Sequence, residues 1–129
     1  NGEMVRDFTY IDDIVSGILH VLDKTAVANL RFDPVNPDPS SSNAPYRVFN
    51  VGNGSPTPLM DYISALEDAL GLKAKVNMLP MQPGDVPVTA ADTSVLNQWV
   101  GFLPNTTVKE GVQKFVDWYL LYHDEKPLF

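Results

Sequence analysis

Residues 5–23, VRDFTYIDDIVSGILHVLD, constrain the fold of this chain more than any other stretch. Phe8 and Tyr10 alternate with other residue types, which is typical of a short strand, and residues 14–22 then carry an apolar stripe at helical spacing. Asp12 is expected to cap this helix, and a second acid follows it, where the helix dipole favours negative charge. A strand that passes directly into an amphipathic helix predicts an α/β fold, with the stripe packed on an element inside or outside this chain.

The rest of the chain repeats extended and helical patterns. Thr107 and Glu110 have the spacing of a capping box, which predicts a helix that begins there. The other expected elements are a strand at 46–52, a helix opened by Thr57 and ended by Gly71, extended segments at 73–80 and 85–92, and a short helix at 93–100. We therefore expect a mixed α+β chain with about four helices and four or five short strands.

Residues 33–45, DPVNPDPSSSNAP, interrupt these patterns. They hold four prolines and a run of three serines without apolar periodicity. Such a composition predicts an exposed, flexible loop, to which we assign no chemistry.

Composition excludes several classes of protein. The 129 residues are enough for one domain, and the net charge of -7 would repel a phosphate backbone, so we expect no nucleic acid partner. No apolar run approaches the roughly 18 to 20 residues that a membrane span needs. Cysteine is absent, and His20 and His123 are too few for a zinc centre. We expect a cytoplasmic globular protein, and a chain that starts at Asn1 reads as a piece of a longer one.

Two familiar spacings have simpler explanations. Residues 52–57, GNGSPT, lie where a dinucleotide-binding turn would lie, but the third glycine and the acid about 20 residues later are missing. A plain strand-to-helix turn is favoured there. Tyr122 and Lys126 have the Tyr-x-x-x-Lys spacing of a catalytic pair, but their place near the chain end favours a chance match.

Arg6 and the turn at 81–86 are the candidate binding groups. Arg6 is the only basic residue before Lys24, and its guanidinium could hold a phosphate with two parallel hydrogen bonds. The alternative is a salt bridge to a nearby acid, Asp7 or Asp12. Gln82 and Asp85 flank a Pro-Gly turn, where an amide and a carboxylate could bind a ribose or a base edge, although such a turn needs no function.

Six blocks of the sequence carry a family resemblance. They are RDFTYIDDIV from Arg6, FNVGNGSP from Phe49, ALEDALG from Ala65, NMLPMQPGDV from Asn77, TAAD from Thr89 and VKEGVQKFVDWY from Val108. In this order the chain resembles nucleotide-sugar epimerases of the extended short-chain dehydrogenase/reductase class, over essentially all residues except 33–45. It is most similar to the UDP-glucuronate 4-epimerases of bacterial surface-polysaccharide synthesis.

The resemblance implies that residues 1–129 are a C-terminal substrate-binding portion. The Rossmann domain, with its Gly-rich NAD loop, catalytic Ser/Thr and Tyr-x-x-x-Lys pair, would precede Asn1. We therefore expect no catalytic residue, no bound NAD and no activity in this chain, although the whole enzyme would use NAD. The helix at 11–23 and the strand at 46–52 would belong to the Rossmann side.

The resemblance also implies roles for four residues. Arg6 would contact the nucleotide diphosphate. Gln82 takes the place of an arginine of the related galactose epimerases, Asp85 keeps its place as a nucleotide ligand, and Thr89 aligns with a position near the sugar. The expected partners are a UDP-sugar and the missing Rossmann domain.

Without that domain, apolar side chains would be left uncovered. Ile14, Ile18 and Phe49 are the expected exposed residues, so we predict self-association of the isolated chain. Two further readings are kept open, which are the same portion of a nucleotide-sugar dehydratase or decarboxylase, and a non-enzymatic protein interaction module.

Overall fold

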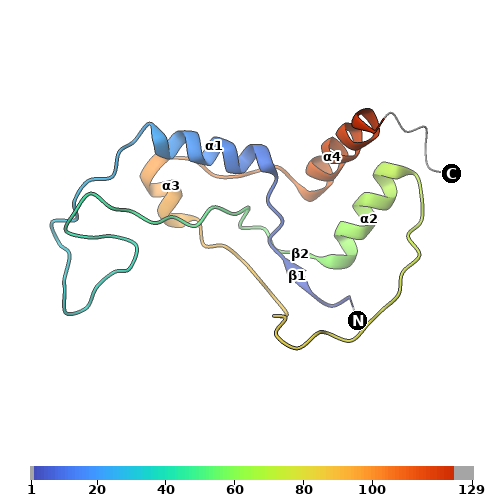
Figure 1. The fold of residues 1–129 in the computed structure, drawn as a ribbon, viewed down its shortest axis with the longest axis horizontal. Helices are drawn as coiled ribbons and strands as arrows, with labels where there is room; N and C mark the ends of the chain where they lie inside the picture. Colours follow the sequence, from blue (N-terminus) through green and yellow to red (C-terminus); the bar gives the residue numbers. More distant parts are fainter. Residues whose placement is uncertain (1, 124–129) are drawn as a thin grey trace.

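The structure is a computed structural model that describes residues 2–123. Its regular elements are four helices and two short strands, joined by long irregular segments (Figure 1). In chain order they are β1 (Val5–Arg6), α1 (Ile11–Leu22), β2 (Thr57–Pro58), α2 (Leu59–Leu70), α3 (Ser94–Val100) and α4 (Val108–Tyr122). The predicted mixed α/β class is confirmed.

The strand β1 lies at the centre of a small extended layer. It pairs antiparallel with β2, so that Val5 stands opposite Pro58. On its other side the Val5 amide donates to the Pro87 carbonyl at 2.9 Å, and the Thr89 amide donates to the Val5 carbonyl at 3.1 Å. Residues 57–58 and 87–89, which are far apart in sequence, are therefore both fixed relative to β1.

The helices α2 and α4 pack against each other, and α4 contributes the buried Val112 and Val116 (Figure 1). The predicted capping box of α4 is confirmed, because the Thr107 hydroxyl accepts from the Glu110 amide at 3.2 Å and the Glu110 carboxylate accepts from the Thr107 amide at 3.0 Å. The hydrogen bond from the Thr107 hydroxyl, and then that from its amide, lowers the pKa of Glu110. The side chain of Glu110 thus holds the start of α4 as a carboxylate.

The predicted strand at 46–52 does not form. Arg47 makes one isolated bridge with Ser41, and residues 48–52 are irregular. Residues 73–80 and 85–92 also form no strand, apart from the bridge of Val88 to Val5. A strand needs a neighbour to pair its backbone groups, and within residues 2–123 the three segments have strand-like pairing only at the isolated bridges of Arg47 and Val88. The described chain therefore has two strands rather than four or five.

Two predicted helix starts are also wrong. The helix α1 begins at Ile11 after Tyr10, and Asp12 lies inside its first turn rather than at its cap. The helix α2 begins at Leu59, because Thr57 and Pro58 are held by β1. The predicted end of α2 is confirmed, since Gly71 adopts a left-handed φ of 67° and donates to the Glu67 carbonyl. Residues 33–45 are irregular and mostly exposed, as predicted, although Ser41 is buried.

The helix α1 turns its apolar stripe outward. Ile11, Ile18 and Leu22 are 61%, 56% and 74% exposed, whereas the side that faces the protein carries Asp13 and Gly17. Among the residues predicted to be uncovered, Ile18 is exposed, while Ile14 and Phe49 are only half-buried. None of the helices within residues 2–123 combines the length and apolar character that a membrane crossing requires.

The solvent-accessible surface is too large for a self-contained domain. It amounts to 9407 Å² for a chain of 14.3 kDa. A folded monomer of that mass exposes about 6,800 Å². The fold thus leaves more surface exposed than a compact monomer of this mass would.

Candidate functional site

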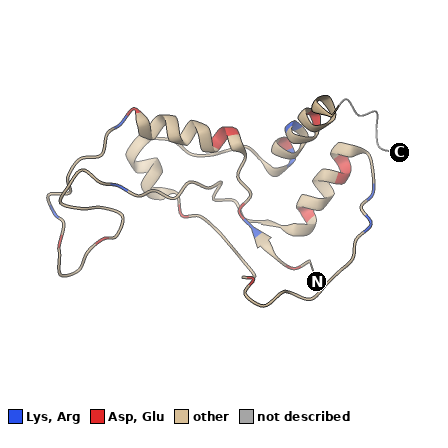
Figure 2. Ribbon diagram, viewed as in Figure 1, with Lys and Arg blue, Asp and Glu red and all other residues tan. Residues whose placement is uncertain are grey.

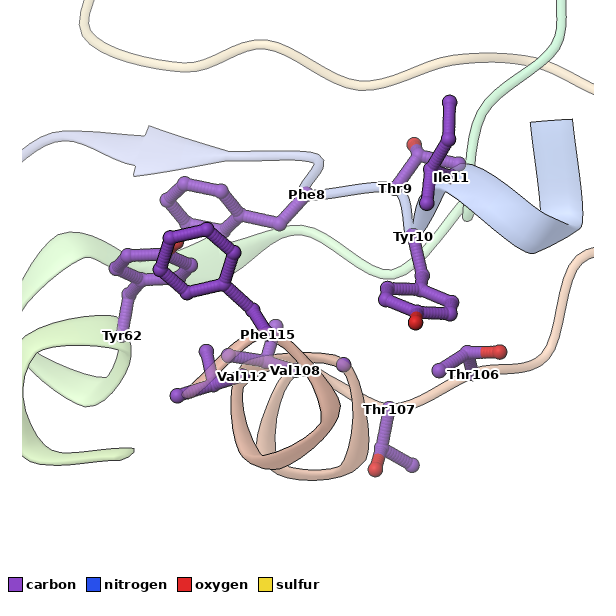
Figure 3. Close-up of a pocket in the computed structure, with 11 residues that line it drawn as sticks. Phe8, Thr9, Tyr10, Ile11, Tyr62, Thr106, Thr107, Val108, Val112 and Phe115 are labelled. Atoms are coloured by element: carbon purple, nitrogen blue, oxygen red, sulfur yellow. The ribbon is translucent and has the colours of Figure 1, made fainter. Parts of the chain in front are cut away.

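The extended segment that follows β1 sends alternate side chains to opposite sides. The ring of Phe8 stacks on Tyr62 of α2 with centroids 4.3 Å apart, and Tyr10 lies against Gly111 of α4 (Figure 3). Together with Phe115 they line a 240 Å³ cavity whose lining has no charged side chain. These contacts anchor the segment on α2 and α4, and the polar groups of the cavity are hydroxyls of threonine and tyrosine.

On the opposite side, Asp7 joins two distant segments. One carboxylate oxygen accepts hydrogen bonds from the amides of Gly54 and Ala91, each at 3.0 Å, and the other accepts from the Ser55 amide at 3.3 Å. The Thr9 hydroxyl accepts from the Asn53 amide at 3.1 Å. Sequence reasoning considered Asp7 only as a partner for Arg6, although the alternation with Phe8 and Tyr10 could have placed it on this side.

These contacts decide what the turn at 52–57 can bind. The amides of three successive residues, 53–55, would be the donors for a phosphate, and all of them donate to Asp7 or Thr9. The geometry supports a plain turn and does not fit a dinucleotide-binding loop. The other familiar spacing lies partly outside the described residues, because Lys126 is beyond residue 123.

Arg6 makes no ion pair with Asp7 or Asp12. Its guanidinium donates to the carbonyls of Val5 at 2.9 Å and Pro87 at 3.3 Å, and to the Met4 sulfur at 3.3 Å. Within residues 2–123, the ion pair that the structure contains is Lys73 with Glu67, at 2.5 Å. Basic positions are few along the ribbon, and one lies on β1 (Figure 2). The charge of Arg6 is therefore uncompensated by a carboxylate and is placed beside the 85–89 segment.

Gln82 and Asp85 line one cavity of 440 Å³. They belong to a tight turn, in which the Asp85 amide donates to the Gln82 carbonyl at 3.1 Å. The same cavity is lined by all four methionines of the chain, which are Met4, Met60, Met78 and Met81. Because the Arg6 guanidinium contacts the Met4 sulfur, Arg6 stands at the edge of this cavity. The structure thus places two of the four predicted residues in the lining of one cavity, and Arg6 contacts a third lining residue, Met4.

Thr89 lies elsewhere. It lines a second cavity of 440 Å³ together with Asp7, Thr9 and residues 49–52. Its amide donates to the Val5 carbonyl, so Thr89 lies beside β1 on the same edge as Pro87. The structure does not bring Thr89 together with Gln82 and Asp85.

The cavity of Gln82 and Asp85 combines polar and apolar groups with a cation nearby, and Glu3 adds a second carboxylate to its lining. A guanidinium at its edge can bind a phosphate, an amide and a carboxylate can bind hydroxyls or a base edge, and thioether side chains supply a polarisable apolar wall. Within residues 2–123, no group of three or more His, Cys, Asp or Glu is placed to hold a metal ion.

Comparison with known proteins connects this geometry to one kind of enzyme. No family model matches the chain. It is 57% identical to an uncharacterised 37.6 kDa protein of Escherichia coli O111:H- over 92% of its length, 49% identical to Protein CapI of Staphylococcus aureus over 95%, and 45% identical to a probable UDP-glucuronate 4-epimerase of Rhizobium meliloti over 92%. The chain spans about a third of the length of these curated relatives, 35% to 37%.

Solved structures give the same result. The chain is 27% identical to a UDP-glucuronic acid 4-epimerase of Bacillus cereus in complex with UDP-glucuronic acid and NAD, with a TM-score of 0.71, over 95% of this chain and 34% of that one. The fold also matches a UDP-glucose 4-epimerase of Bifidobacterium longum in complex with NAD+ and UDP, with a TM-score of 0.71, 22% identity, and coverage of 94% and 31%. The predicted resemblance to nucleotide-sugar epimerases is confirmed.

Proposed function

We propose that this chain is the UDP-sugar-binding portion of an NAD-dependent nucleotide-sugar 4-epimerase. It aligns with about a third of the length of UDP-glucuronate 4-epimerases. The substrate pair would be UDP-glucuronate and UDP-galacturonate. The observation that supports the proposal is a cavity lined by Gln82 and Asp85, with Arg6 in contact with its lining residue Met4, in a chain related to such enzymes.

Each residue has a role that its chemistry suits. Arg6 pairs with the diphosphate, because it carries positive charge at the cavity edge without a carboxylate partner. Gln82, which is neutral, donates to or accepts from uracil or ribose, and Asp85 accepts from ribose hydroxyls. Thr89 lines a separate cavity with Asp7 and Thr9, and in this proposal it meets only the sugar end of the ligand.

In this proposal the groups for oxidation and reduction at the sugar C4 lie outside this chain. NAD supplies the hydride acceptor when it is bound by the whole enzyme, and the turn at 52–57 does not fit it, since its amides are engaged by Asp7 and Thr9. In this proposal a Rossmann domain outside residues 1–129 holds NAD and the catalytic residues, and the isolated chain is inactive. Residues 11–23 and 46–52 would be the parts that join that domain.

The proposal accounts for two irregularities of the fold. The outward stripe of α1 would be covered by the Rossmann domain, and the unpaired residues 46–52 would gain strand neighbours there. Both features cost free energy in the isolated chain, because apolar surface and backbone groups stay unpaired with protein.

Titration calorimetry of the chain with UDP and with UDP-glucuronate tests the proposal. We expect weak binding that is lost in Arg6→Ala and kept in Arg31→Ala, which removes an equal charge from an exposed position away from the cavity. Binding that survives in Arg6→Ala would contradict the role of Arg6. Failure of the unchanged chain to bind either ligand would contradict the claim that it forms the UDP-sugar-binding portion by itself.

A further inference from the structure

The clearest unexplained feature is the number of hydrogen bonds on one side chain. Asp7 accepts three backbone hydrogen bonds from two segments, 54–55 and 91, that lie 47 to 84 residues away in sequence. Carboxylates that accept several amide hydrogen bonds hold them more firmly than a neutral oxygen would. Asp7 directly follows Arg6, the proposed phosphate ligand.

The register of β1 explains why a side chain is used. Val5 makes the two backbone hydrogen bonds of a parallel bridge, to residues 87 and 89. If the ladder continued, the carbonyl of residue 7 would accept from the amide of residue 91. Instead the Asp7 carboxylate accepts from the Ala91 amide. The side chain thus replaces the backbone acceptor, and the main chain is free to turn into α1 while residue 91 stays in register.

Close packing reinforces this arrangement. A Cβ atom at Gly52 would lie 2.4 Å from the Ala91 Cβ and 3.1 Å from the Asp7 carboxylate. Residues 52 and 91 are therefore packed closely against each other beside the Asp7 side chain. The position of the 85–91 segment relative to β1 depends on this side chain. That segment carries Asp85 and Thr89, while β1 carries Arg6.

We infer that Asp7 is a positioning residue of the nucleotide site, which fixes the Arg6 guanidinium relative to the 85–91 segment. The inference rests on the proposed function for its ligand. It assigns to Asp7 no contact with the nucleotide. Removing its charge should misplace the phosphate ligand while the cavity with Gln82 and Asp85 remains, because that turn is closed by its own hydrogen bond.

The test measures the affinities of Asp7→Asn for UDP and for uridine. This substitution keeps the shape of the side chain but replaces one carboxylate oxygen, which accepts hydrogen bonds, with an NH2 group among the three backbone donors. We expect the affinity for UDP to fall about tenfold, as for a lost hydrogen bond to a charged group, and that for uridine to stay within about twofold. In the Arg6→Ala background, Asp7→Asn should cause no further loss, because two residues that act through one contact are not additive. Asp12→Asn, at an exposed position of α1, is the control for charge and should change neither affinity.

An equal loss for UDP and uridine, or a full additional loss in the double variant, would overturn the inference. If the unchanged chain binds neither ligand, the inference is tested without ligand. The nuclear magnetic resonance spectra of the free unchanged chain and of free Asp7→Asn are then compared. If Asp7→Asn shifts the Arg6 side-chain N–H and the Thr89 amide as well as the amides of Gly54 and Ala91, the positioning role stands although the proposed function fails. If only Gly54, Ser55 and Ala91 respond, Asp7 holds the turn alone and the inference is wrong.

Discussion

Four consecutive side chains of the extended segment, residues 7–10, perform two separate tasks. Phe8 and Tyr10 fill the apolar space beside α2 and α4, and Asp7 and Thr9 accept hydrogen bonds from the turn at 52–55. Successive side chains of an extended chain point to opposite sides, so a single short segment can do both. The side chains that position the site are thus held from one side by packing and from the other by hydrogen bonds.

Gly52 should tolerate no side chain unless Ala91 makes room. We predict that Gly52→Ala lowers the free energy of unfolding by about 1 to 3 kcal/mol, as expected for an overpacked contact, because its Cβ would overlap that of Ala91. Urea denaturation measures the change. Adding Ala91→Gly should recover part of the loss, since it removes the atom that is struck. Strictly additive effects of the two substitutions would contradict this contact.

The residues of the site differ in how well sequence could foresee them. The chemistry of Arg6, Gln82 and Asp85 pointed to them, and the structure places Gln82 and Asp85 in one cavity whose lining residue Met4 contacts Arg6. Asp7 was missed as a structural acceptor because its donors are 47 to 84 residues away, and no local pattern contains such a separation. The resemblance indicated Thr89, and the structure places it at a different cavity from Gln82.

Among the elements, helices were predicted better than strands, for a physical reason. The capping box at Thr107 and the left-handed Gly71 are local signals, and the hydrogen bonds of a helix are made within it. The strand at 46–52 depends on a neighbour that residues 2–123 do not supply, so its aromatic and branched composition is insufficient. The helix α1 combines a feature that sequence can predict with one that it cannot. Its formation depends on local hydrogen bonds, whereas the burial of its apolar stripe depends on contacts with other segments.

The stripe of α1 should promote association of the chain with itself. We predict that Ile18→Gln combined with Leu22→Gln lowers the apparent mass in light scattering at high concentration, because both side chains are more than half exposed on one helix face. The free energy of unfolding of the monomer should change by less than about 0.5 kcal/mol, as for exposed positions. Leu30→Gln, at a residue 96% exposed and outside α1, is the matched control. A chain that is monomeric throughout would contradict the prediction.

At the scale of the whole molecule, the fold leaves a large surface exposed. Its accessible surface exceeds that of a compact monomer of equal mass by about 2,600 Å², and one fully apolar helix stripe is uncovered. The chain also spans only about a third of the relatives that it resembles. These three observations agree with a module that binds the nucleotide-sugar against a second domain.

A titration of UDP followed residue by residue in the nuclear magnetic resonance spectrum of the isotopically labelled chain tests the central claim most directly. The account predicts that the shift changes concentrate at Arg6 and residues 82–85, with smaller changes at Thr89 and none along the outward face of α1. No change at saturating UDP, or changes confined to the aromatic cavity between α2 and α4, would contradict the assignment of the nucleotide site.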